Sequence, residues 1–252
     1  MRRELHAEWT KLRTEPGAGR LLLGLVTLTA VTGVALTAGV TCPWDRCTQD
    51  TVKLGLTGVQ LGQAFAVMLA VRMISGEYGT GLIRLTLAAM PRRTTVLAAK
   101  ATLLTGLTLA GGAVAVAASL LGAGLLLPAR GYPPPSPADG PTLRAALGSV
   151  LYLALIALIS LGLATVLREP AAAAGTVLGL LYLFPLAVLL LPDPDWQRLL
   201  WRLSPMNAGL AVQATTGLDD LPLDPWTGLA VPAAWAAAAL LAGGLALRRR
   251  DA

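Results

Sequence analysis

Six long runs of apolar residues divide the chain and predict its architecture. The runs cover residues 21–40, 54–71, 98–127, 145–167, 171–191 and 227–247. Each run is long enough to cross about 30 Å of hydrocarbon as a helix, and only Lys100, at the start of the third, adds a charge. Hydrophobic residues make up 55% of the chain, which excludes a soluble protein with one water-excluded core. We predict an all-α polytopic membrane protein with six transmembrane helices, forming a single domain over residues 1–252.

The lysines and arginines predict how these helices are oriented. With the N-terminus inside, the outer segments hold six of the 20 basic residues, and the inner segments hold the rest. The six are Arg46, Lys53, Arg130, Arg144, Arg198 and Arg202. Because basic residues favour the cytoplasmic side, we expect both termini in the cytoplasm and the protein in the plasma membrane. The net charge of +6 then reflects orientation, and no nucleic acid is expected as a partner.

Residues 2–15, ahead of the first run, predict an amphipathic helix. Leu5, Trp9 and Leu12 recur at helical spacing, and charged residues fill the positions between them. We expect this helix to lie in the inner headgroup layer, with Trp9 as the interfacial anchor. An unstructured basic tail is the alternative.

Small residues recur at four-residue spacing in two of the runs. The third run carries Gly111, Ala115 and Ser119, and the fifth carries Gly175 and Gly179. Small residues let the backbones of membrane helices approach closely, so both sets predict helix packing. Pro185 predicts a kink in the fifth span.

Gln60 and Gln63 place two polar side chains on one face of the second span. In a bilayer each amide needs a hydrogen-bond partner. One interpretation is a polar stripe that faces a translocation path or a dimer seam, and the other is a pair of ordinary interhelical hydrogen bonds.

Two cysteines, Cys42 and Cys47, lie in the first outer loop. Facing an oxidising exterior, they can close a small disulfide loop. Two free thiols at the membrane edge are the alternative.

The outer segment 192–226 mixes aspartates with leucines and tryptophans. This composition predicts short amphipathic helices that lie on, or dip into, the outer leaflet before the last span.

The longest inner loop, from Arg72 to about residue 95, predicts a short apolar helix. Residues 80–90 can form about three turns, which end at Pro91 because proline disfavours helical geometry in the residue before it. A helix this apolar is not stable in water and must dock on the inner leaflet or on a partner protein. We expect Leu82, Ile83, Arg84 and Leu87 to form the contact.

This loop resembles the permeases of ABC type 2 exporters from actinobacteria. The resemblance rests on residues 75–84 (SGEYGTGLIR), 88–93 (AAMPRR) and 98–100 (AAK), with support from residues 7–13 (AEWTKLR) and 59–63 (VQLGQ). It covers the first 100 residues well, whereas the last 150 agree only in span count and loop pattern. Arg72 departs from the small or apolar residue usual at its position.

The resemblance implies a six-span permease half that pairs with an identical or different second half. A separate ABC ATPase subunit hydrolyses ATP and drives efflux, so the chain itself has no catalytic, metal or cofactor site. The loop helix is then the coupling helix that enters a cleft of the ATPase. Its interface residues are Thr80, Leu82, Ile83, Arg84, Leu87, Pro91, Arg92 and Arg93.

Two other function classes fit the sequence less well. An ion-coupled secondary transporter usually carries an acidic residue near the middle of the membrane, and the runs contain none. A membrane enzyme lacks support because His6 is the one histidine, and no catalytic set of side chains accompanies it. The sequence also has no GxxxxGK[ST] motif with which to bind ATP itself.

Overall fold

The computed structural model describes residues 2–14, 16–41, 49–79, 93–136 and 138–249. Across these residues every regular element is a helix, and six helical segments are long and apolar enough to cross a membrane. The predicted all-α fold with six candidate membrane spans is therefore confirmed.

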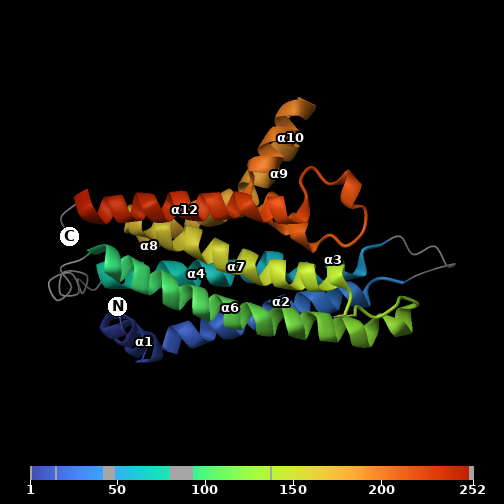
Figure 1. Ribbon diagram of the computed structural model, residues 1–252, viewed down its shortest axis with the longest axis horizontal. Coiled ribbons are helices and arrows are strands. Elements are labelled where there is room, and N and C mark those ends of the chain that lie inside the picture. Colours follow the sequence, from blue (N-terminus) through green and yellow to red (C-terminus); the bar gives the residue numbers. More distant parts are fainter. Residues whose placement is uncertain (1, 15, 42–48, 80–92, 137, 250–252) are drawn as a thin grey trace.

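Figure 1 shows the spans side by side along one long axis. The continuous spans are α2 (Pro16–Ala38), α4 (Gly58–Gly79), α6 (Arg93–Leu126), α7 (Gly140–Leu167) and α12 (Pro225–Arg249). The fifth span consists of α8 (Pro170–Leu178), a π-helical turn η2 (Gly179–Leu183) and α9 (Phe184–Leu189). The short elements are α1 (Arg2–Thr14), α3 (Thr51–Leu56), η1 (Pro128–Arg130), α10 (Pro194–Leu203), α11 (Pro205–Leu210), η3 (Ala211–Gln213) and η4 (Leu218–Asp220).

The second and fourth spans form the interior of the bundle. In the most apolar window of each, 61% of the residues are buried, compared with 22–28% in the other four spans. α7 packs against α4, α6 and α12, and its Tyr152 and Ile156 are fully buried. The other four spans therefore present broad apolar faces to lipid or to another protein.

Small residues bring α2, α3, α4 and α6 together. A Cβ atom added to Gly58 would stand 2.0 Å from the carbonyl oxygen of Thr29 on α2. Ser119 on α6 donates a hydrogen bond to the carbonyl oxygen of Gly55 at 2.6 Å. These contacts confirm the predicted packing of the third span through Gly111, Ala115 and Ser119, since Ala115 and Ser119 are fully buried and Gly111 faces Leu22.

The fifth span departs from that pattern. A Cβ added to Gly175 would meet nothing within 4 Å, and one added to Gly179 would meet only Leu183 of the same span. The single chain provides no packing partner for this glycine pair, so its role in helix packing stays a prediction. Pro185, which predicts a kink, lies directly after the π-helical turn, where its ring and missing N–H prevent a regular helix.

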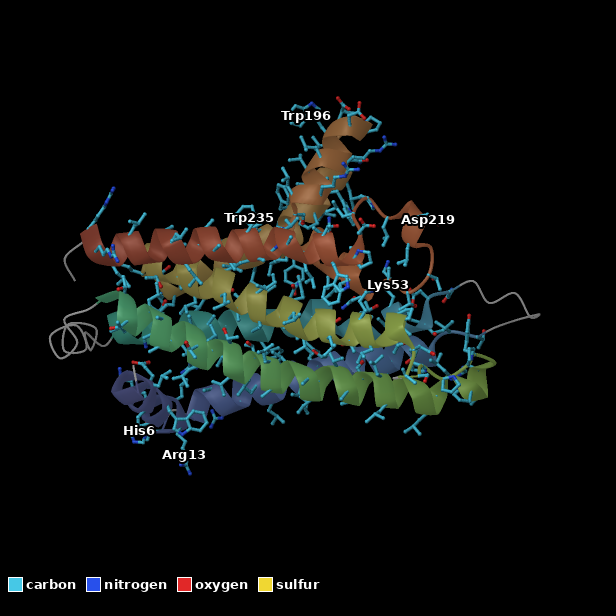
Figure 2. All side chains as sticks on the ribbon, viewed as in Figure 1. His6, Arg13, Lys53, Trp196, Asp219 and Trp235 are labelled. Atoms are coloured by element: carbon cyan, nitrogen blue, oxygen red, sulfur yellow. The ribbon has the colours of Figure 1, made fainter. Side chains whose placement is uncertain are left out.

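Beyond the kink, α9 and α10 run away from the bundle (Figure 1). α10 is amphipathic, and Figure 2 places Trp196 at its far tip and Trp235 of α12 at its base. The indole Nε1 of Trp235 donates to the carbonyl oxygen of Leu203 at 3.1 Å. The amphipathic helix expected between the fifth and the last span is thus present as α10.

The next segment differs from the expected outer-leaflet helices. Residues 208–214, which include η3, are buried among α7, α12 and α3. Gly209 lies against the Tyr152 ring, and Gly148 lies against the Val212 side chain. The chain here enters the bundle and leaves it again without crossing, because small residues on both sides leave room for a short re-entrant helix.

Candidate functional site

The stems of the inner loop define the candidate site. α4 ends at Gly79 and α6 begins at Arg93. Both stems lie at the end of the bundle that holds α1 and the C-terminal end of α12 (Figure 1). Of the predicted interface residues, Thr80, Leu82, Ile83, Arg84, Leu87, Pro91 and Arg92 lie outside the described residues, and Arg93 is described only as the first residue of α6.

Glu8 of α1 and Lys100 of α6 form a buried ion pair at this end. Lys100 Nζ donates to Glu8 Oε2 at 2.6 Å and to the carbonyl oxygen of Met73 on α4 at 2.9 Å. Lys11 Nζ donates to the other carboxylate oxygen, Glu8 Oε1, at 3.0 Å. Glu8 is 2% exposed and Lys100 is 1% exposed, so the pair is shielded from water.

This ion pair joins three elements. The ammonium group belongs to one stem of the loop and donates both to the Glu8 carboxylate of α1 and to a backbone carbonyl of the other stem. Removing one member of a buried pair leaves an uncompensated charge, at a cost of about 3–5 kcal/mol. In the sequence Glu8 is one of the charged residues between the apolar positions of α1, and helical spacing places it close to the face of Leu5 and Leu12. The structure buries it because Lys100 provides a buried counter-charge.

Arg72 lies where α1 meets α2. Its guanidinium group covers Gly17, where an added Cβ would stand 2.8 Å from Arg72 Cζ. Arg72 also borders a small cleft together with Leu12 of α1 and Met73. Arg72, which replaces the small or apolar residue expected from the resemblance, therefore places a cation against the turn between α1 and α2.

Gln63 lies in the interior of the chain, fully buried. Its Oε1 accepts a hydrogen bond from the Tyr152 hydroxyl, and its Nε2 donates to Met206 Sδ at 3.2 Å. Both polar ends of the amide are thus bonded to other elements, α7 and α11, as buried amides in a membrane require.

Gln60 lies one turn away in a different environment. It is half-buried, and its backbone carbonyl accepts a hydrogen bond from the Tyr182 hydroxyl of η2. The two glutamines therefore share a face of α4 but contact different elements.

Further polar contacts hold the re-entrant segment, and the sequence reasoning missed them. The Asp50 carboxylate accepts from the Thr215 amide at 2.5 Å, the Thr215 hydroxyl at 2.7 Å and the Thr216 amide at 3.2 Å. Gln213 Nε2 donates to Ser149 Oγ at 3.0 Å and to the Leu56 carbonyl at 3.3 Å. The signal available in the sequence was Gln213, a single glutamine among apolar residues, because its amide needs hydrogen-bond partners when it is buried.

The described residues contain no group of three or more His, Cys, Asp or Glu side chains that could hold a metal ion. Cys42 and Cys47 lie outside the described residues, so their predicted disulfide stays a prediction.

Comparison with known families gives the decisive observation. The sequence matches the profile of the family described as "ABC-2 family transporter protein" over residues 34–252. The chain belongs to this family. As an ABC-2 family protein it is a membrane permease component of an ABC transporter, a multi-pass plasma membrane protein and a partner of an ABC ATPase subunit. No curated protein matches the chain.

The family match also changes the extent of the resemblance. It runs through the last 150 residues, where the motifs gave little, and includes the re-entrant segment and α12. It begins at residue 34, after α1 and most of α2. The ion pair between Glu8 and Lys100 therefore joins a helix outside the matched region to one inside it.

Proposed function

We propose that this ABC-2 protein is one half of an exporter and acts in a pair of permease halves with twelve spans in total. A separate cytoplasmic ATPase binds the loop between α4 and α6 and drives efflux of the substrate. The chain supplies the path through the membrane and has no ATPase site of its own.

The ion pair at the stems of the loop is the observation that carries this proposal. A coupling element must pass force to the spans, and a buried charge contact joins both stems and α1 at the loop's base. Displacement of the loop would change the distance between α4 and α6. The Lys100 ammonium opposes this change because it bonds α6 to the Met73 carbonyl of α4. The predicted interface residues run from Thr80, directly after α4, to Arg93, the first residue of α6.

The charge distribution supports a cytoplasmic location for this end. Arg13, Arg72, Arg168, Arg248 and Arg249 belong to elements that start or finish here. Basic residues flanking spans favour the cytoplasmic side. Both termini of the chain then face the cytoplasm, on the same side as the ATPase.

Gln60 is the better candidate of the two glutamines for a translocation path or dimer seam. Its side chain is half-buried on α4, whereas the Gln63 amide is bonded inside the chain. Transport activity of the paired halves is needed to test this assignment.

Co-purification with the ATPase tests the proposal. Replacing Leu82 and Ile83 with Asp places two charges on the apolar helix, and we expect the tagged ATPase to be lost from the purified complex. Leu218→Asp with Leu223→Asp, at the other end of the bundle, is the matched control and should retain it. Equal recovery of the ATPase with both variants would contradict the proposal.

A further inference from the structure

A groove with a cation at one end separates α6 from α12. The wall residues of α6 are Leu97, Ala98 and Ala101, and those of α12 are Leu240, Leu241, Gly244 and Leu245. Thr94, Thr102 and Arg248 complete the lining, and the volume is about 510 Å³. Ligand clefts span roughly 300–1,000 Å³, so the groove has the size of a binding site.

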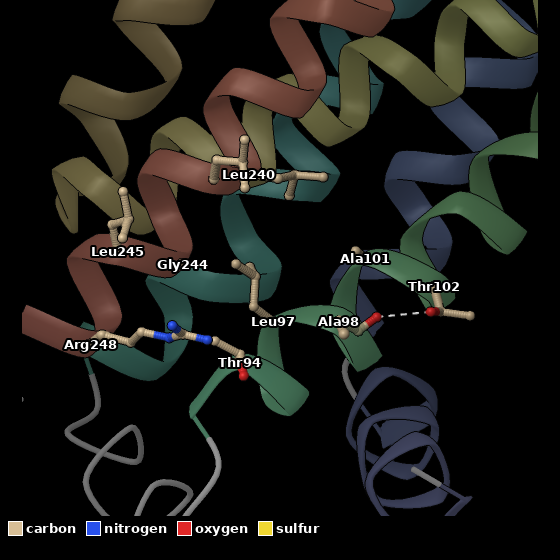
Figure 3. A pocket seen from close by; sticks show the side chains of 10 residues that line it. Thr94, Leu97, Ala98, Ala101, Thr102, Leu240, Gly244, Leu245 and Arg248 are labelled. Atoms are coloured by element: carbon tan, nitrogen blue, oxygen red, sulfur yellow. Dashed lines mark hydrogen bonds between the residues drawn. The ribbon is translucent and has the colours of Figure 1, made fainter.

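Figure 3 shows how the polar end of the groove is arranged. The Arg248 side chain extends from α12 toward Thr94 on α6 (Figure 3). Arg248 is exposed and has no ion-pair or hydrogen-bond partner within the described part of the chain. The buried Lys100 differs in this respect, because Glu8 neutralises it.

The depth of the groove fits a lipid. Thr94 is the second residue of α6 and Arg248 the last but one of α12, so the cation lies where two spans leave the hydrocarbon. From there the walls continue toward the membrane interior and are apolar apart from Thr102, whose hydroxyl donates to the Ala98 carbonyl at 2.8 Å. A phospholipid has the same order of groups, a charged phosphate at the interface followed by acyl chains.

We propose that this groove binds one anionic phospholipid. An acyl chain lies between α6 and α12, the phosphate binds the Arg248 guanidinium, and the Thr94 hydroxyl is a second donor. Guanidinium groups bind phosphate oxygens in bidentate geometry, and basic pockets between spans are suited to anionic headgroups.

The positive charge of Arg248 favours an anionic lipid over a zwitterionic lipid and over a helix of a second copy. A zwitterionic lipid carries its own cation, which would face Arg248 and the adjacent exposed Arg249. A helix from a second copy would have to bury Arg248 without a counter-charge, which is unfavourable. An anionic lipid satisfies both the apolar walls and the cation.

Native mass spectrometry of the full-length protein tests the site. The protein is released from nanodiscs made of equal amounts of phosphatidylglycerol and phosphatidylcholine with the same acyl chains. We expect one retained phosphatidylglycerol, and about five- to tenfold weaker retention in Arg248→Gln, since one interfacial cation contributes about that factor. Arg249→Gln, next to it but outside the groove lining, should retain the lipid.

A second pair of variants tests the apolar walls. Gly244→Leu fills the groove, because a Cβ at this position would stand 4.0 Å from Leu97 Cδ2 and the longer side chain extends between the helices. Gly106→Leu adds the same bulk to an exposed position of α6 with nothing within 4 Å. We expect Gly244→Leu to lose the retained phosphatidylglycerol and Gly106→Leu to keep it.

Three results would overturn the lipid site. Equal loss in Arg248→Gln and Arg249→Gln would indicate general attraction to charged headgroups. Equal retention of the two lipids would remove the role of the cation. Loss of a dimer in Gly244→Leu, with lipid unchanged, would assign the groove to a second copy. The assay contains no ATPase, so its outcome is separate from the proposed exporter function.

Discussion

Glu8 and Lys100, 92 positions apart in the sequence, form a buried ion pair that holds α1 against α6. Glu8 also accepts from Lys11, which is partly exposed, and Lys100 also donates to the Met73 carbonyl. The pair is therefore the centre of a larger polar contact that joins α1, α4 and α6.

We expect Glu8→Gln and Lys100→Met each to destabilise the protein. Either change removes one member of a buried ion pair, at a cost of about 3–5 kcal/mol. Thermal unfolding in detergent measures both, with exposed Arg13→Gln on the same helix as the control. Combining Glu8→Leu with Lys100→Met should recover most of the loss. Equal melting temperatures for Glu8→Gln and the control would refute a stabilising pair.

Substitution of the two glutamines of α4 should have different effects: loss of Gln63 should lower stability, and loss of Gln60 should affect transport. Gln63→Leu leaves the buried Tyr152 hydroxyl without its acceptor and should cost about 1–3 kcal/mol in the free energy of unfolding. Gln60→Leu keeps the backbone carbonyl that Tyr182 uses, so we expect a change within about 0.5 kcal/mol. Thermal unfolding measures this, and substrate-stimulated ATPase activity of the complex reports whether Gln60 lines the path. A larger loss of stability in Gln60→Leu would reverse the assignment.

Asp50 should control the opening of the re-entrant segment. Asp50→Ala removes a charged acceptor from the amides of Thr215 and Thr216, a loss of about 1.5–3 kcal/mol for hydrogen bonds to a charged group. Hydrogen exchange at these amides should accelerate by roughly 10- to 100-fold. Exposed Asp219→Ala in the nearby turn is the control and should leave exchange unchanged. Unaltered exchange in Asp50→Ala would show that the segment is held by packing alone.

Alanine substitutions of Gly58 and Gly175, each inside an apolar run or at its edge, should change stability in opposite directions. Gly58→Ala places a Cβ 2.0 Å from the Thr29 carbonyl oxygen and forces α2 and α4 apart, at a cost of about 1–3 kcal/mol or more. Gly175→Ala meets nothing in the chain and should raise stability by about 0.4–1 kcal/mol. Melting temperatures and the oligomeric state check both. Loss of a dimer in Gly175→Ala would show that a second permease half packs on this span.

The spans were predictable from sequence because a bilayer imposes one length and one composition on every crossing helix. α1 was predictable as a helix from its periodicity, but the inward direction of Glu8 was not. That direction depends on Lys100, a partner distant in the sequence. A buried ion pair has no local pattern, so each charge taken alone resembled a solvated one.

The re-entrant segment shows a second limit of sequence reasoning. Residues 204–215 are too short and too mixed to predict a span, and their aspartate-rich neighbours indicated an outer surface. Their burial depends on space left by Gly148, Gly209 and Gly228, whose role emerges only when α7, α11 and α12 are packed together. The small-residue pattern was confirmed for α6, whereas Gly175 has no neighbour within the chain, because spacing alone does not say which neighbour a face meets.

The first turn of α1 and the last turn of α12 lie at the same end of the bundle as the stems of α4 and α6 (Figure 1). An affinity tag or fluorescent protein fused at either terminus would therefore crowd the surface on which the ATPase is proposed to dock. The exposed turn around Leu218, at the opposite end, offers an insertion point for an epitope that leaves that surface clear.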